Sequence, residues 1–151
     1  MRREVIHAVA QWRKGVSRYD TVLIKLNNGE SGMRAFSVGR LRLLFSFRYF
    51  MSTYICALVD DFHVVDDGPD LDTGMWKVKK AFHLRSRRRL SRVICLTDIL
   101  RAVHLIPIFK VTVTGRQVML PEKSSPDTAL DDYQLFYVNK YIDHHMFEIL
   151  S

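Results

Sequence analysis

The amino-acid sequence predicts an α+β domain in which a small, strongly bent antiparallel β-sheet, barrel-like in shape, is followed by a C-terminal α-helix. Two observations predict this class. Five or six short runs rich in β-branched and aromatic residues succeed one another between residues 17 and 120, separated by turn-forming loops. The apolar residues then change to a helical spacing near the end of the chain. With 151 residues, the chain is long enough for one domain with a hydrophobic core.

We expect four segments within this domain. They are an N-terminal segment (1–16), a β-rich domain (17–120), a linker rich in Ser and Pro (121–128) and a C-terminal helix packed on the same domain (129–151). The spacing of apolar residues between Val5 and Trp12 favours a short first helix, which Gly15 would end.

The clearest local pattern is a predicted hairpin over residues 38–63. Apolar and aromatic side chains recur at every second position: Leu41, Leu43, Phe45, Phe47 and Tyr49. Because side chains alternate between the faces of a strand, this pattern predicts that Phe45 and Phe47 point into the core. The connection at residues 50–52 lacks the glycine or asparagine that usually marks a tight hairpin turn.

Other strands are predicted on either side of this hairpin. They cover residues 21–26, 75–81, 92–96 and 104–109, with a further weak strand within 111–118. Pro107 places the strand at 104–109 on a sheet edge, because proline cannot donate to the ladder. Residues 98–102 suit a single turn.

The predicted C-terminal helix is based on one apolar stripe. Its members are Leu135, Val138, Ile142, Met146 and Ile149. Ser125 or Asp127 could cap the helix, and Asp131 and Asp132 would lie favourably at its positive end.

Charge and composition narrow the class of protein. The net charge of +7 favours contact with polyanions, usually nucleic acid, although a soluble protein with a merely basic surface fits equally well. No apolar run approaches the ~20 residues that span a bilayer, and the first residues lack the features of a secretory signal, so we expect no membrane partner. A nuclear or cytoplasmic location follows, with the nucleus favoured. Cys56 and Cys95 lie in apolar runs and are predicted to be buried free thiols.

A basic run supplies the candidate binding residues. Its members are Lys77, Lys79, Lys80, Arg85, Arg87, Arg88, Arg89 and Arg92, with no acidic residue among them. A strand–loop–strand of this kind can contact backbone phosphates of DNA. A solvated loop and a nuclear import signal remain alternatives. A secondary basic face would come from the predicted hairpin: Arg40, Arg42 and Arg48.

An acidic run precedes the basic one and contains six aspartates between residues 60 and 72. Clustered carboxylates can hold divalent metals, but their spacing here is that of ordinary turn-forming aspartates. We therefore expect no catalytic residue, no metal site and no cofactor, and we interpret the chain as not being an enzyme.

Five stretches of the chain resemble a known family. They are SRYDTVLI (17–24), YICALV (54–59), GPDLDTGMW (68–76), DILRAVHLIP (98–107) and FYVNKYIDHH (136–145). Their order is similar to the C-terminal region of basidiomycete transposase-like proteins of the Plavaka type, which are related to the CACTA group. The resemblance covers roughly residues 17–150. The chain departs from the family in its hairpin turn, Tyr49 to Ser52, which lacks glycine, and in its density of arginine between residues 79 and 92.

The resemblance implies a fungal mobile-element protein whose catalytic carboxylates lie in a separate upstream domain. The resulting hypothesis is a non-catalytic accessory domain that contacts nucleic-acid phosphates through the loop of the basic run (83–89), with DNA, another protein or the upstream transposase domains as partners. One alternative is a chromatin-reader-like β-barrel module that binds protein through a cleft of aromatics such as Tyr49, Phe50, Tyr54 and Trp76. A functionless truncated remnant is another.

Overall fold

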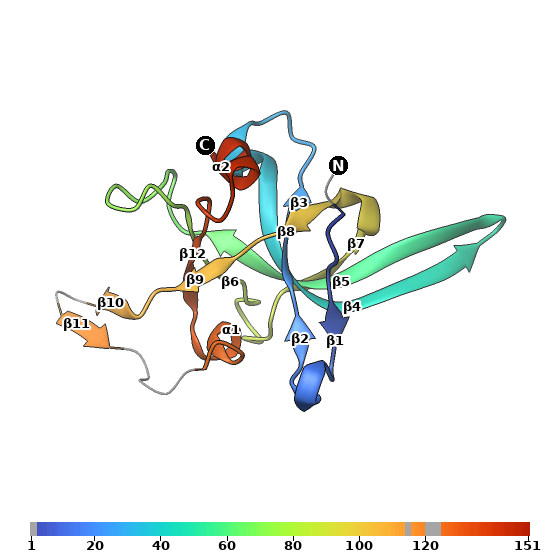
Figure 1. The fold of residues 1–151 in the computed structure, drawn as a ribbon, viewed down its shortest axis with the longest axis horizontal. Helices are drawn as coiled ribbons and strands as arrows, with labels where there is room; N and C mark the ends of the chain where they lie inside the picture. The colour runs from blue at the N-terminus through green and yellow to red at the C-terminus, as the bar shows by residue number, and fades with distance from the viewer. Residues whose placement is uncertain (1–2, 114–115, 120–124) are drawn as a thin grey trace.

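The computed structural model describes residues 3–113, 116–119 and 125–151 and confirms the α+β class (Figure 1). Its main feature is a strongly curled antiparallel sheet of eight strands, with a short helix at the C-terminus. The strands of this sheet are β3 (Thr21–Lys25), β4 (Phe36–Tyr49), β5 (Ser52–Val64), β6 (Lys77–Lys80), β7 (Ser91–Cys95), β8 (Ile99–Ala102), β9 (Leu105–Pro107) and β12 (Leu135–Val138).

Two strand pairs and several short helices complete the described residues. The pairs are β1 (Ala8–Val9) with β2 (Arg18–Tyr19), and β10 (Lys110–Val113) with β11 (Arg116–Met119). The α-helices are α1 (Ala129–Asp132) and α2 (His144–Leu150), and the 3-10 turns are η1 (Arg13–Gly15), η2 (Gly32–Ala35) and η3 (Leu96–Asp98). No helix in these ranges is long and apolar enough to cross a membrane.

The sheet curls into a half-barrel. Its strand order is β8-β3-β4-β5-β6-β12-β9, and β7 pairs with β5 off this path. The first and last strands of the order, β8 and β9, are separated along the chain by only Val103 and His104. The two ends of the sheet are therefore successive parts of one bent segment. Pro107 lies in the terminal strand β9, as predicted for an edge.

The sheet buries apolar residues on both of its faces. The larger cluster surrounds Phe136, Leu23 and Val78 and is covered by Met146 and Leu150 of α2. The smaller cluster is formed by Val22, Ile24, Leu41, Ala57, Val59 and Ile94, and the N-terminal segment packs on it. Strands β3 and β4 contribute to both clusters, so their burial pattern does not alternate cleanly.

Gly39 permits the close approach of strands in the smaller cluster. A Cβ at this position would lie 2.8 Å from the Ile24 Cδ1 atom and 3.1 Å from the Val59 Cβ atom. Both distances are below ordinary van der Waals contact, so a larger residue would push two buried side chains apart.

The predicted hairpin is confirmed, but the predicted burial of its aromatics is wrong. A β-bulge at Arg42 shifts the register between Leu41, which pairs with Val59, and Leu43, which pairs with Leu58. Because a bulge adds one residue, it reverses which face the later side chains occupy. Leu41 is fully buried, whereas Phe47 is 47% exposed and Phe45 is only half-buried.

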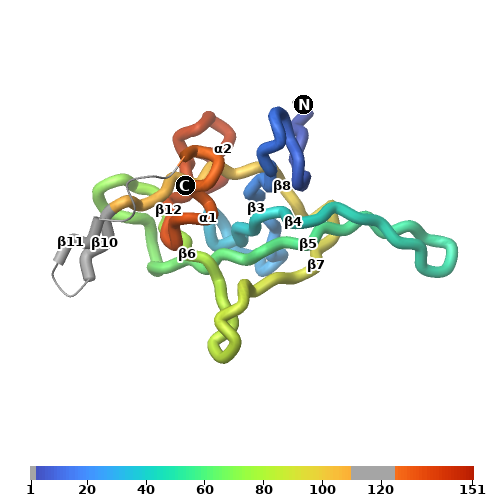
Figure 2. Tube along the Cα trace, turned by 90° about the horizontal axis from the view of Figure 1, so that it is seen from below, coloured from blue at the N-terminus to red at the C-terminus, as the bar shows by residue number. Residues whose placement is uncertain are grey.

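Beyond the bulge, the hairpin leaves the body of the molecule. We call residues 43–55 the arm; it projects away from the rest of the chain in both views (Figures 1 and 2). Its turn residue Phe50 has φ of 51°, the left-handed region that bulky residues rarely adopt. The arm exposes eight large apolar side chains: Leu43, Leu44, Phe47, Tyr49, Phe50, Met51, Tyr54 and Ile55.

The predicted C-terminal helix over residues 129–151 is mostly wrong. Residues 135–138 form strand β12, which lies between β6 and β9, and only residues 129–132 and 144–150 are helical. Phe136 and Val138 alternate with less buried neighbours, so the run also has the period of a strand, and pairing with two distant strands decides its structure. Asp143, not Ser125 or Asp127, caps α2 by accepting a hydrogen bond from the Met146 amide.

Two other predictions need correction. Residues 5–12 contain strand β1 in place of a helix, because Ala8 and Val9 pair with β2. Residues 99–102, predicted as a turn, form strand β8 beside β3. The predicted weak strand at 111–118 corresponds to β10 and β11, and residues 121–124 of the predicted linker lie outside the described residues.

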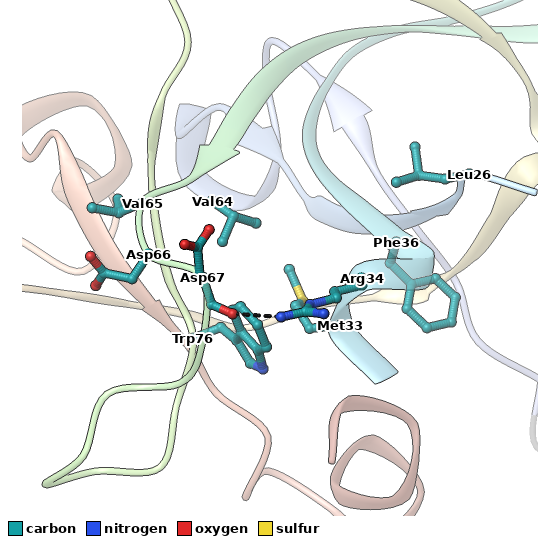
Figure 3. Close-up of a pocket in the computed structure, with 9 residues that line it drawn as sticks. All are labelled: Leu26, Met33, Arg34, Phe36, Val64, Val65, Asp66, Asp67 and Trp76. Carbon is teal, nitrogen blue, oxygen red and sulfur yellow. Dashed lines mark hydrogen bonds between the residues drawn. The ribbon is translucent and has the colours of Figure 1, made fainter. Parts of the chain in front are cut away.

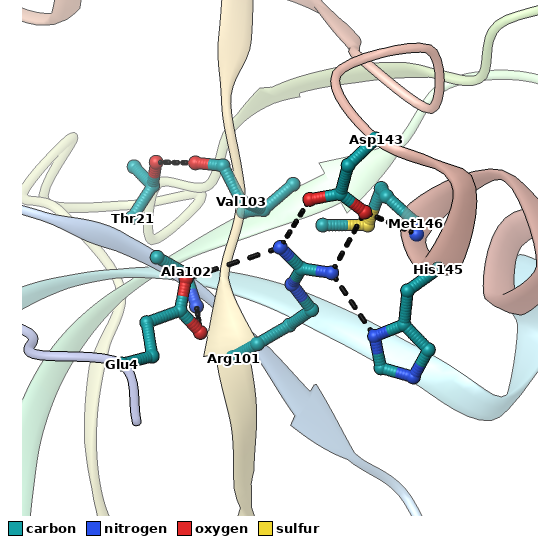
Figure 4. A network of polar contacts seen from close by, with 8 residues as sticks. All are labelled: Glu4, Thr21, Arg101, Ala102, Val103, Asp143, His145 and Met146. Atoms are coloured by element: carbon teal, nitrogen blue, oxygen red, sulfur yellow. Dashed lines mark hydrogen bonds and ion pairs between the residues drawn. The ribbon is translucent and has the colours of Figure 1, made fainter. Parts of the chain in front are cut away.

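A charged network joins β8 to the C-terminal segment (Figure 4). The Arg101 guanidinium donates to both carboxylate oxygens of Asp143, at 2.6 and 3.1 Å, and lies 3.1 Å from the His145 Nδ1 atom. The hydrogen bonds from Arg101 and from the Met146 amide lower the pKa of Asp143 to about 2. This pair fixes the start of α2 against the sheet.

Candidate nucleic-acid interface

The loop between β6 and β7 carries the centre of the predicted basic run. An isolated bridge pairs Phe82 with Arg89, and the His83 amide donates to the Arg88 carbonyl. The Arg87 amide donates back to the His83 carbonyl, and Arg87 has φ of 52°. These bonds make residues 82–89 a closed, ordered loop, which projects from the sheet in Figure 2.

Three arginines lie at the tip of this loop, which we call the basic loop (residues 83–88). The side chains of Arg85, Arg87 and Arg88 are exposed. None of them has an ion-pair partner among the residues that the structure describes. Three guanidiniums on one ordered loop, without an internal acid, form a surface suited to phosphate oxygens.

The lysines of the basic run differ in their availability. Lys77 pairs with Asp66 and Asp70 at 3.0 and 3.4 Å, and these partners raise its pKa. Lys80 donates to the Asp131 carbonyl, while burial and the neighbouring Arg89 lower its pKa. Lys79 is exposed. Lys77 and Lys80 therefore already have partners within the fold, and their predicted contact with nucleic acid stays a prediction.

The remaining arginines of the run also serve the fold. Arg92 binds the Asp61 carboxylate with its Nε atom at 2.9 and 3.0 Å and donates to the Ser37 hydroxyl. Arg89 donates to the Ala81 carbonyl and lies over the Phe62 and Phe82 rings, and burial lowers its pKa.

The predicted secondary basic face does not form as one surface. Arg40 is buried and pairs with Asp131 at 2.6 Å. Arg42, the bulge residue, lies 3.5 Å from Asp60 and over the Tyr19 ring. Only Arg48, on the arm, is an exposed cation without such a partner among the described residues.

Sequence reasoning missed the residue that organises these cations. Asp131 accepts from Arg40 through its carboxylate and from Lys80 through its carbonyl. It lies 91 and 51 residues away from them along the chain. No local sequence pattern predicts these two contacts, because they depend on where α1 packs.

The aspartates of the acidic run are turn formers and ion-pair partners. Asp70 accepts hydrogen bonds from the Thr73 amide and hydroxyl, and these bonds lower its pKa. Asp60 accepts from the Ser91 hydroxyl and Asp61 binds Arg92. Within the described ranges, no three His, Cys, Asp or Glu side chains converge on a point where a metal ion could lie.

A hollow of about 320 Å³ lies at the end of β5 that is remote from the arm (Figure 3). Its walls include Trp76, Phe36 and Met33, the acidic loop residue Asp67, and Arg34, whose guanidinium donates to the Asp67 carbonyl. The other aromatics proposed for a peptide cleft are on the arm, so the four predicted side chains do not form one cleft. The hollow is separate from the arm.

The two cysteines are cross-strand neighbours. Cys56 of β5 is opposite Cys95 of β7, and both are free thiols. Cys56 is buried, and burial raises its pKa, with a further contribution from Cys95. Cys95 is exposed, which corrects its predicted burial.

Comparison with known proteins gives no relative: the chain has no significant match to a protein-family model, to a curated protein or to a solved structure.

Proposed function

We propose that this chain is a non-catalytic accessory domain that contacts the phosphates of nucleic acid through its basic loop. The observation that carries the proposal is the cluster of Arg85, Arg87 and Arg88, exposed and free of acidic partners among the described residues. The resemblance of the chain to transposase-like mobile-element proteins implies that the polyanion is DNA and that the location is the nucleus.

The order of the loop favours binding. Holding a flexible side chain or loop in place on association costs free energy, so a loop already closed by backbone hydrogen bonds loses less. The bonds between His83, Arg87 and Arg88 provide this closure. Lys79 is exposed on the adjoining strand and supplies a fourth positive charge. Contacts of this kind bind the DNA backbone and do not select a base sequence.

The test is fluorescence-anisotropy titration of labelled duplex DNA across a series of salt concentrations. Each phosphate neutralised contributes about 0.9 to the slope of log affinity against log salt. The variant with Arg85→Ala, Arg87→Ala and Arg88→Ala should therefore bind all sequences more weakly, with a slope smaller by about 3. Arg89 is left unchanged because its side chain packs between rings of the fold.

A matched control removes the same charge elsewhere. Arg13, Lys14 and Lys25 are exposed and lie outside the basic loop, the first two in η1. Their triple alanine variant should keep most of the wild-type slope. Equal losses in both variants would mean that binding follows net charge and not this loop, and the proposal would then be wrong.

A further inference from the structure

The outer edge of the arm has no described backbone partner. Strand β4 pairs with β3 only from Phe36 to Arg40, and the Leu41 amide still donates to the Asp20 carbonyl. From Leu43 to Tyr49, β4 pairs only with β5 among the described residues. An edge strand of this length is normally covered, charged or shortened, because its free N–H and C=O groups are ready to pair with another strand.

The arm is also apolar on both faces. At about 200 Å² for each fully exposed large apolar side chain, the exposed fractions along the arm amount to about 900 Å². A monomer rarely exposes so large a contiguous apolar patch. A standard protein interface buries about 800 Å² on each partner, so the exposed apolar area of the arm, summed over both faces and the turn, is of the size that an interface covers.

We infer that the partner of this edge is a second copy of the same chain, whose β4 adds antiparallel to it about a two-fold axis at Ser46. In this register Phe45 is opposite Phe47 of the second copy, and Leu44 is opposite Arg48, so no two like charges face each other. Centring the axis on Phe45 would place Arg42 opposite Arg48, and like charges directly opposite destabilise a sheet. Centring it on Phe47 would pair a shorter stretch before the turn.

The arm suits a second copy better than nucleic acid or an acidic protein. Its stacked rings, Phe45 with Phe47 and Phe47 with Tyr54, form an apolar surface with one exposed cation, Arg48. Apolar surface of this kind is complementary to itself. The inference is independent of phosphate binding, because the basic loop lies outside the arm.

The first experiment is sedimentation analysis of the full chain over the micromolar to submillimolar range in reducing buffer. We expect the mean mass to rise toward twice that of the monomer. Phe47→Lys should weaken the dimer at least ten-fold, whereas Leu71→Lys, which replaces a fully exposed apolar residue outside the arm, should not. A wild-type chain that remains monomeric throughout overturns the inference.

The second experiment tests the register in a background where Cys56 and Cys95 are replaced by serine. At a two-fold axis, Ser46→Cys places two thiols on directly opposite residues, where Cα atoms about 5 Å apart allow a disulfide. Arg48→Cys is the matched control, since the two copies of residue 48 would lie about 13 Å apart along the strand. We expect dimer-sized disulfide products for Ser46→Cys alone. A dimer in which neither position, or both equally, forms the bond places the second copy elsewhere and overturns the inference.

Discussion

The two halves of strand β4 differ in how far their apolar side chains are buried. From Val38 to Arg40 the strand pairs with both β3 and β5, and the Val38 and Leu41 side chains are buried in the body. From Leu43 to Tyr49 it continues as the arm, and the same alternation of apolar residues faces solvent. The bulge at Arg42 separates the halves. Apolar periodicity therefore predicts a strand, but whether the apolar face of that strand is buried depends on tertiary packing.

The largest expected difference in the free energy of unfolding comes from replacing one aromatic residue in the body and one in the arm. Phe136→Ala empties the centre of the larger cluster, and truncation of a buried Phe costs about 3–5 kcal/mol. Phe47→Ala on the arm should cost less than about 1 kcal/mol, because that ring is already 47% exposed. Urea unfolding at low protein concentration measures both. Equal losses would show that the arm is as well packed as the body.

The hairpin illustrates how much of the fold the sequence could predict. Its strands were predicted because the period-two pattern is local and long. The bulge was not, since Arg42 resembles any polar residue in an alternating strand. The wrong helix prediction at residues 135–138 has the same origin, because pairing with β6 and β9 involves residues far away along the chain.

The cations of the candidate site also fall into two groups, one that the local sequence predicts correctly and one that depends on distant contacts. The arginines of the basic loop were predicted to be available because a run without acids in a loop has few local partners. Lys80, Arg40 and Arg92 were also predicted to be available, but their partners lie 31 to 91 residues away. Local charge density identifies a basic loop, but it does not identify which cations fold with acids brought from elsewhere.

A smaller effect is expected from the ion pair that holds α2 to the body. The pKa of Asp143 is about 2, below its ordinary value of 3.8. A carboxylate whose folded pKa is depressed stabilises the fold above its unfolded pKa, and the contribution disappears as pH falls from about 4 to about 2. Thermal unfolding of wild type and Asp143→Asn should therefore differ by a few degrees near neutral pH and converge at pH 2.

The choice of asparagine sharpens this test, because asparagine also caps helices well and so preserves the cap at the start of α2. The difference between the two proteins then reports the charge interaction with Arg101. The same pH change should leave the arm unaffected, since residues 43–55 contain no carboxylate. A constant difference from neutral pH to pH 2 would contradict a role for the ionised pair.

The smallest expected effect lies at the tip of the arm. Phe50 has φ of 51°, a conformation that costs a bulky residue about 1 kcal/mol or more and costs glycine almost nothing. Phe50→Gly should therefore stabilise the monomer by about 0.5 kcal/mol after the entropy of glycine in the unfolded chain is subtracted. Met51→Gly is the control, because Met51 has no positive φ and should lose stability instead. Urea unfolding with opposite signs at these adjacent positions would show that the turn is held in a strained form by the strands it joins, whereas two losses would mean that the Phe50 side chain stabilises the arm.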